Sequence, residues 1–166
     1  MGVVGWKNSG KTTLITRLIP ALGARGISVS TIKHVHHAID LDEPGKDTFR
    51  HREAGAVDVV MYSEARWALL HERRSELDPA AELAELVRRM SPVDLILVEG
   101  FKKVAMRRIE IRWGDAAPLT GDRGAETLAV VTDGSPDPDL PSFRRDEIEG
   151  LADFIADTLN IDLLKW

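Results

Sequence analysis

The sequence predicts an α/β fold in which a mostly parallel, twisted sheet is flanked by helices, and three observations support this prediction. A glycine-rich segment at residues 5–13 lies between a short apolar run and a stretch with helical periodicity. Segments of strand character then alternate with segments of helical character, which is the order that parallel βαβ units produce. Residues 93–98 form the most apolar run, as expected of a central parallel strand covered on both faces.

Size and composition narrow the class of protein. The chain has 166 residues, so residues 1–166 are predicted to form one domain. It has no cysteine, which excludes disulfides and cysteine nucleophiles and favours a reducing, cytoplasmic location. The net charge of -5 argues against a nucleic-acid partner, and no apolar run is long enough to predict association with a membrane.

The first half of the chain begins with a very short apolar strand before Gly5. The helix that follows the glycine-rich segment is predicted to run to about Leu22, with Pro20 kinking it or ending it early. Residues 34–43 have no periodicity and are expected to form a functional loop. Asp47 is a candidate cap of a short helix. Alternating or apolar runs predict further strands at residues 27–33, 57–62 and 67–71.

The second half shows a similar alternation. Asp78 and Pro79 are typical of a helix start, with Asp at the N-cap and Pro in the first turn. Residues 109–113 predict a strand with one wet face, and residues 128–132 a buried strand. Asp146 and Glu149 are spaced as a capping box before the last helix. The helix after Pro79 is expected to bury a stripe formed by Leu83, Leu86, Val87 and Met90.

Residues 5–13 fit the phosphate-loop pattern of Gly, four residues and Gly-Lys-Ser/Thr. Glycines allow a tight turn in which backbone amides point inward, and the following helix N-terminus favours phosphate. In this pattern Lys11 reaches the β- and γ-phosphates and the Thr12 hydroxyl coordinates Mg²⁺. A P-loop NTPase-like fold is therefore predicted, with nucleotide-binding residues Gly5, Trp6, Lys7, Asn8, Ser9, Gly10, Lys11, Thr12 and Thr13.

A second metal ligand is expected at the carboxyl end of a buried strand, because nucleotides bind beyond that edge of a parallel sheet. Asp94 and Glu99 flank the most apolar run and are separated by about 16 Å at the rise of a strand, so both cannot reach one site. Glu99 lies at the correct end and is predicted to bind Mg²⁺ together with Thr12. Asp94 is better explained as a residue of the strand entry.

Histidines cluster in the loop that follows the second strand. On an extended segment His34 and His36 would share a face, and with His37 and a carboxylate such as Asp40 they suggest a transition-metal site. The spacing of these residues does not require three of them to bind one metal ion. A polar rim that contacts phosphate or substrate is the competing interpretation. Asp47 is a candidate to hold the metal or to orient water, in competition with its role as a helix cap.

Taken together, these motifs resemble one family, the molybdopterin-guanine dinucleotide biosynthesis adaptor proteins (MobB). The phosphate loop alone is not specific, but its combination with Lys-His-x-His-His and Val-Glu-Gly-Phe-Lys is. The resemblance spans nearly the whole chain. It is carried by residues 8–14, 32–37, 44–48, 54–56, 66–69, 94–102 and 148–154.

The resemblance implies a protein that binds GTP with Mg²⁺, forms homodimers and assists the MobA-like guanylyltransferase that joins GMP to molybdopterin. Molybdopterin itself is a possible second ligand. GTP hydrolysis is expected to be weak, with Lys11 and Asp47 as the catalytic candidates. The alternative is a metal-insertion GTPase that carries its metal on the histidine cluster. A small-molecule kinase is a third class, but no segment clearly supplies an acceptor pocket or an Arg-bearing lid.

Recognition of guanine is not explained by a known motif, since the chain lacks the Asn/Thr-Lys-x-Asp segment that many GTPases use. Asp133 follows a buried strand, and a carboxylate can accept hydrogen bonds from guanine N1–H and the 2-amino group. An ordinary turn aspartate is the competing interpretation. A basic series after Glu99 is expected either to receive a phosphate or an acidic partner, or to form a solvated strand edge. It comprises Lys102, Lys103, Arg107, Arg108 and Arg112.

Overall fold

The computed structural model describes residues 1–35, 41–73, 78–119 and 126–159. Backbone packing divides the chain into two compact units, Met1–His34 with Pro79–Trp166, and Val35–Asp78. The second unit is therefore an insertion in the sequence of the first. No helix within the described residues is both long and apolar enough to cross a membrane.

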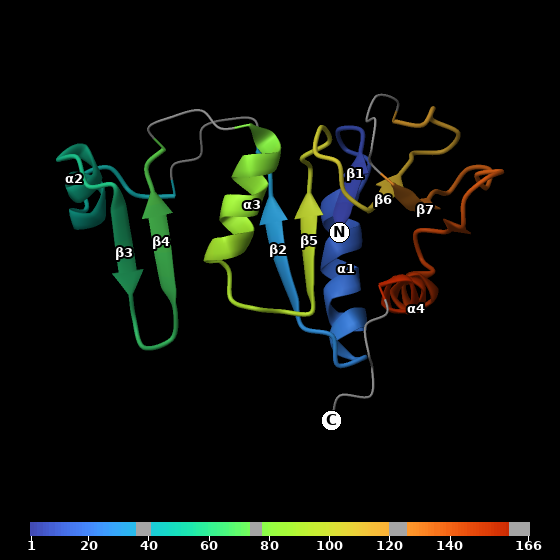
Figure 1. The fold of residues 1–166 in the computed structure, drawn as a ribbon, viewed down its shortest axis with the longest axis horizontal. Helices are drawn as coiled ribbons and strands as arrows, with labels where there is room; N and C mark the ends of the chain where they lie inside the picture. Colours follow the sequence, from blue (N-terminus) through green and yellow to red (C-terminus); the bar gives the residue numbers. More distant parts are fainter. Residues whose placement is uncertain (36–40, 74–77, 120–125, 160–166) are drawn as a thin grey trace. The chain divides into compact units, whose positions relative to one another are not determined.

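The first unit is built on a six-stranded sheet in which every neighbouring pair is parallel (Figure 1). The predicted mostly parallel sheet is confirmed. β1 lies in the interior of this sheet, between β5 and β6. Because all three strands are parallel, the carboxyl end of β1 lies between the carboxyl ends of β5 and β6. The strands in spatial order are β2 (Val29–Lys33), β5 (Leu95–Glu99), β1 (Gly2–Gly5), β6 (Arg108–Ile111), β7 (Thr127–Val131) and β8 (Ser142–Phe143).

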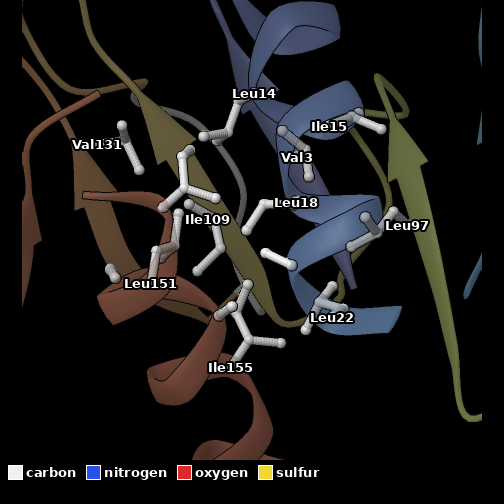
Figure 2. Packing of buried hydrophobic residues seen from close by; sticks show 14 of the residues in the cluster. Val3, Leu14, Ile15, Leu18, Leu22, Leu97, Ile109, Val131, Leu151 and Ile155 are labelled. Atoms are coloured by element: carbon white, nitrogen blue, oxygen red, sulfur yellow. The ribbon is translucent and has the colours of Figure 1, made fainter. Parts of the chain in front are cut away.

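Helices α1 (Lys11–Gly23) and α4 (Ile148–Thr158) cover one face of this sheet. Leu14, Leu18 and Leu22 recur every four residues, so α1 presents one apolar stripe to the strands. Figure 2 shows this stripe packed with strand residues and with Leu151 of α4. A fully buried leucine contributes on the order of 2 kcal/mol to folding. The core therefore holds α1, and with it the loop at its start, against the sheet.

The opposite face carries a smaller apolar cluster that includes Val98 and Phe101. Helix α3 (Pro79–Arg89) begins at the predicted proline and packs on this cluster through Leu83. The predicted stripe of α3 is only partly correct, because Leu86 and Val87 remain 38% and 40% exposed.

The second unit contains helix α2 (Asp47–Glu53) and an antiparallel hairpin of β3 (Asp58–Tyr62) and β4 (Trp67–His71). Both predicted strands are present. Arg52 ties the unit together, since its guanidinium pairs with Asp42 at 3.2 Å and with Glu72 at 2.6 Å.

Three local predictions were wrong. The strand predicted with one wet face, β6, is buried along its whole length, because Arg112 neutralises the buried carboxylate of Glu110. The predicted capping box of α4 does not form, and Glu147 is the N-cap. Likewise Lys46, not Asp47, is the N-cap of α2, and Asp47 is its first residue.

Candidate functional site

The phosphate loop connects β1 to α1 at the carboxyl edge of the sheet, as predicted. A Cβ atom on Gly5 would lie 2.5 Å from Ser9 Oγ and 2.6 Å from the Ile111 carbonyl oxygen, so only glycine fits there. Gly10 precedes α1 with φ of +92°, and Asn8 also has a positive φ. These left-handed residues turn the chain back on itself immediately before the helix. The loop is therefore shaped as its motif requires.

Lys11 lies over the loop that precedes it. Its ammonium donates to the carbonyl oxygens of Trp6 at 2.7 Å and of Gly5 at 3.2 Å. Burial lowers the pKa of Lys11, and neighbouring Lys102 and Lys33 lower it further, while Glu99 opposes them. The ammonium is thus crowded by positive charge, which a phosphate group would relieve.

Thr12 and Glu99 meet at the head of the loop although they are far apart in the sequence. The Thr12 hydroxyl lies 3.0 Å from Glu99 Oε1 and 3.1 Å from Oε2. Two neighbouring ligands of octahedral Mg²⁺ lie about 3 Å apart when each metal–oxygen distance is near 2.1 Å. A hydroxyl and a carboxylate are also the oxygen donors that Mg²⁺ prefers. The two side chains therefore fit the predicted metal site in both chemistry and spacing.

Lys33 joins this pair, and the sequence interpretation did not assign it a role. It is the last residue of β2 and stands in register with Glu99 of β5. Its ammonium lies 3.3 Å from Glu99 Oε1 and 3.2 Å from the Thr12 hydroxyl oxygen. The signal that could have found it is its place at a strand end, because parallel neighbours bring their last residues together.

Asp94 lies at the opposite end of β5 and has a structural role. Its carboxylate accepts hydrogen bonds from the backbone N–H and the hydroxyl of Ser28. This contact ties the starts of β2 and β5 together, in agreement with the interpretation of Asp94 as a strand-entry residue.

His34 packs beside the segment that follows Glu99. Its backbone N–H donates to the Glu99 carbonyl at 2.9 Å, and its ring lies 4.6 Å from the Phe101 ring. Glycine at position 100 allows this close packing of His34. Gly100 has φ of +97°, and a Cβ atom there would lie only 3.0 Å from His34 Cβ. His36, His37 and Asp40 lie outside the described residues. Within the described ranges, no three His, Cys, Asp or Glu side chains gather as a metal site. The metal-insertion alternative, which depends on His36 and His37, stays a prediction of the sequence.

The other residues predicted in the loop differ in their surroundings. Trp6 is 52% exposed, and the Lys102 ammonium lies 5.3 Å from the centre of its ring. Lys7 and Asn8 are exposed, while Ser9 is buried. Thr13 is exposed, and its carbonyl accepts a hydrogen bond from Thr16. Asp47 opens α2 in the second unit, and its catalytic role stays a prediction.

Asp133 lies just beyond β7, and Arg145 holds it near the phosphate loop. Arg145 Nε is 2.7 Å from Asp133 Oδ2. The same guanidinium donates to the carbonyl oxygens of Ser9 at 2.7 Å and Arg112 at 2.8 Å. It also lies 4.8 Å from the centre of the Trp113 ring. The sequence interpretation missed Arg145, and no local pattern marks it, because β8 before it has only two residues.

Most of the basic series after Glu99 serves the structure. Arg108 is buried and donates to Thr127. Burial would lower the pKa of Arg112, but hydrogen bonds to Glu110 and Asp137 outweigh this and raise it. Arg107 pairs with Glu126 on the surface. Lys102 is the member of the series that lies at the phosphate loop.

The phosphate loop lies at the carboxyl edge of a parallel sheet, and the Glu99 carboxylate of the neighbouring strand β5 contacts the Thr12 hydroxyl. This combination defines a P-loop nucleotide-binding protein. The family model described as "Molybdopterin guanine dinucleotide synthesis protein B" (MobB) matches residues 1–133. The chain belongs to this family, whose members act as adapter proteins in molybdopterin guanine dinucleotide biosynthesis.

Known proteins agree with this assignment over nearly the full length. The molybdopterin-guanine dinucleotide biosynthesis adapter protein of Escherichia coli is 41% identical over 164 residues, which cover 95% of this chain and 91% of the relative. The protein of the same name from Haemophilus influenzae is 35% identical over 96% of this chain and 89% of its own. A crystal structure of molybdopterin-guanine biosynthesis protein B superposes with a TM-score of 0.76 at 35% identity, covering 96% of this chain and 97% of that one.

Proposed function

We propose that the protein binds GTP with Mg²⁺ and, in that state, assists the guanylyltransferase that attaches GMP to molybdopterin. The observation that carries the proposal is the contact of the Thr12 hydroxyl with the Glu99 carboxylate at 3.0 Å, at the mouth of the phosphate loop. Membership in a family that makes a guanine dinucleotide supplies the identity of the nucleotide.

Different groups of the site contact different parts of the triphosphate and its metal. The backbone amides of residues 6–12 and the N-terminus of α1 face the phosphates. Lys11 exchanges the carbonyl oxygens of Gly5 and Trp6 for phosphate oxygens. Thr12 and Glu99 hold the metal, which neutralises charge on the β- and γ-phosphates when bound.

We further propose that Asp133 reads the guanine base. Its carboxylate has the acceptors that guanine N1–H and the 2-amino group require. Arg145 links it to Ser9 of the phosphate loop, which sets the base-reading group at a fixed distance from the phosphates. The exposed ring of Trp113 beside Arg145 offers a surface on which a base can stack.

Slow hydrolysis of GTP is part of the proposal. The Glu99 carboxylate is the proposed metal ligand beside Thr12, so it is committed to the metal site and is poorly placed to activate water. Binding and delivery of the nucleotide therefore suit this site better than its rapid turnover. Lys102, next to Trp6, is the residue best placed for a second phosphate such as that of molybdopterin.

A homodimer is proposed from the family, and the hairpin of the second unit offers a suitable surface. Val60, Tyr62, Trp67 and Leu69 lie on one face of the ribbon, since Val60 pairs with Leu69 and Tyr62 with Trp67. All four are exposed, and exposed apolar patches of this kind mark interfaces. Light scattering that gives the mass of one chain at micromolar concentration would contradict the homodimer.

The decisive experiment is a pull-down of the guanylyltransferase by the tagged full chain, with GTP and Mg²⁺, with GDP and Mg²⁺, and without nucleotide. We expect the enzyme to be retained most strongly with GTP, and the Lys11→Ala variant to lose this dependence. Failure to retain the enzyme in all three conditions would contradict the adaptor role.

A further inference from the structure

We propose that Lys33 is an internal competitor of Mg²⁺ for Thr12 and Glu99, and that it makes metal binding depend on the nucleotide. The inference rests on the proposed function, in which Thr12 and Glu99 hold the metal. It adds a role for a residue of β2 that belongs neither to the phosphate loop nor to the metal ligands.

The sheet itself places Lys33 at the metal site. β2 and β5 are parallel neighbours, and their register pairs Lys33 with Glu99 at the last residue of each strand. The backbone continues this pairing, because the His34 N–H donates to the Glu99 carbonyl. The Lys33 side chain therefore starts from a fixed point next to the carboxylate.

The ammonium of Lys33 contacts the same oxygens that the metal needs. It lies 3.3 Å from Glu99 Oε1 and 3.2 Å from Thr12 Oγ1. A Mg²⁺ ion bound to these two oxygens would lie about 2.1 Å from each, within a few ångströms of the ammonium. The two cations repel each other strongly at that distance, so Lys33 has to leave before the metal can bind.

The difference in burial between Glu99 and Lys33 indicates which of the two side chains can move. The Glu99 side chain is 13% exposed, whereas the Lys33 side chain is 53% exposed. Glu99 is thus held in place, and the flexible stem of Lys33 can swing aside at little cost. Lys11 and Lys102 add positive charge at the same place, since Lys33 and Lys102 both act on the Lys11 ammonium. A free divalent cation therefore meets an unfavourable field.

A triphosphate removes this obstacle in two ways. Its oxygens accept the displaced Lys33 ammonium, and they supply further ligands to the metal. Metal and nucleotide then bind together, and neither a bare metal ion nor a metal-free nucleotide receives the full set of contacts. We therefore expect strong positive coupling between the two ligands, and Lys33 as its main source.

The first test is the binding of Mn²⁺, followed by electron paramagnetic resonance, to the purified full chain without nucleotide. Lys33→Gln should bind Mn²⁺ about tenfold more tightly than the parent protein, because the competing charge is gone. Lys33→Arg, which keeps the charge, should resemble the parent. Lys46→Gln removes an exposed lysine of the second unit and serves as the matched control for net charge.

The gained affinity must belong to the proposed site. In a Lys33→Gln, Glu99→Gln double variant the additional Mn²⁺ binding should disappear, whereas binding to other acidic groups of the surface would persist. An unchanged Mn²⁺ affinity in Lys33→Gln, including no binding at any concentration tested, would overturn the proposal.

The second test is the coupling between metal and nucleotide, measured by calorimetry. The factor by which Mg²⁺ increases affinity for GTP should be about tenfold smaller in Lys33→Gln than in the parent. An equal coupling factor in the two proteins would contradict the inference even when GTP binds to both. If neither protein bound GTP, the proposed function would fail, while the Mn²⁺ result would still decide the role of Lys33 at the site.

Discussion

Two positions on the carboxyl edge of the same parallel sheet each pair a carboxylate with a basic side chain, but the two pairs are held differently. On the phosphate side, Glu99 is paired with Lys33, whose contacts are to side-chain oxygens and whose side chain is 53% exposed. At the position proposed to read the base, called the base side below, Asp133 is paired with Arg145, which is 22% exposed and is also held by two backbone carbonyl oxygens.

This difference indicates that the Lys33 ammonium can be replaced by another cation more easily than the Arg145 guanidinium. A half-exposed ammonium with two side-chain partners is easily replaced, which suits a place where a metal ion enters and leaves. Arg145 is fixed by its hydrogen bonds to two backbone carbonyl oxygens, and its ion pair with Asp133 places that carboxylate beside the loop. The phosphate side thus suits the proposed exchange of cations, and the base side suits a fixed position of the proposed base-reading group.

The largest effect is expected from Lys11→Ala, which removes the central cation of the phosphate side. Charge-assisted hydrogen bonds to phosphate are each worth about 1.5–3 kcal/mol, and Lys11 is expected to reach both the β- and γ-phosphates. Loss of two such bonds should lower affinity for GTP at least about a hundredfold. Calorimetry at constant Mg²⁺ would measure the loss, with Lys46→Ala as a control for removal of a lysine. A Lys11→Ala variant that bound GTP like the parent would refute the site.

A smaller effect is expected from Asp133→Asn on the base side. An amide offers one acceptor where the carboxylate offers two, so affinity for GTP should fall about ten- to a hundredfold. The amide can donate to the 2-oxo group of xanthine, so binding of xanthosine triphosphate should improve. Binding of ATP should not change, because adenine lacks the donors concerned. Equal losses for all three nucleotides would mean that Asp133 does not read the base.

Arg145→Met tests whether the base side depends on fixed geometry. Asp133 would keep its chemistry but lose its position, so discrimination between GTP and inosine triphosphate, which lacks the 2-amino group, should shrink about threefold to tenfold. Competition binding at constant Mg²⁺ would measure the ratio. Arg145→Lys should recover part of it. A purely structural role would lower the thermal unfolding midpoint and leave the ratio unchanged.

The smallest effect concerns pH and again separates the two sides. Burial and the neighbouring lysines lower the pKa of Lys11, and bound phosphate should raise it again. GTP binding should therefore take up protons at alkaline pH, and affinity should weaken as pH rises through the lowered pKa. Calorimetry in buffers of different ionisation enthalpy would measure the proton uptake. Its persistence in Lys11→Ala would assign it to another group.

Local patterns were sufficient for most of the fold and for the placement of the phosphate loop beside Glu99. The Gly-x₄-Gly-Lys-Thr spacing implies a strand, a loop and a helix, and the apolar run of β5 shows at which end Glu99 lies. Short or compensated elements were not predictable in this way. β8 has two residues, too few for a pattern, and β6 has no wet face because Arg112 pairs with Glu110.

By itself, the sequence determined the phosphate loop, the pairing of Thr12 with Glu99 and the resemblance to the MobB family, since these depend on residues that are close in the chain or on strand direction. Only the tertiary structure decided the roles of Lys33 and Arg145. Lys33 reaches Glu99 through the register of two parallel strands, and Arg145 reaches Ser9 across 136 positions of the chain. Contacts of this kind depend on how strands and loops are arranged in space, and no periodicity along the chain records that arrangement.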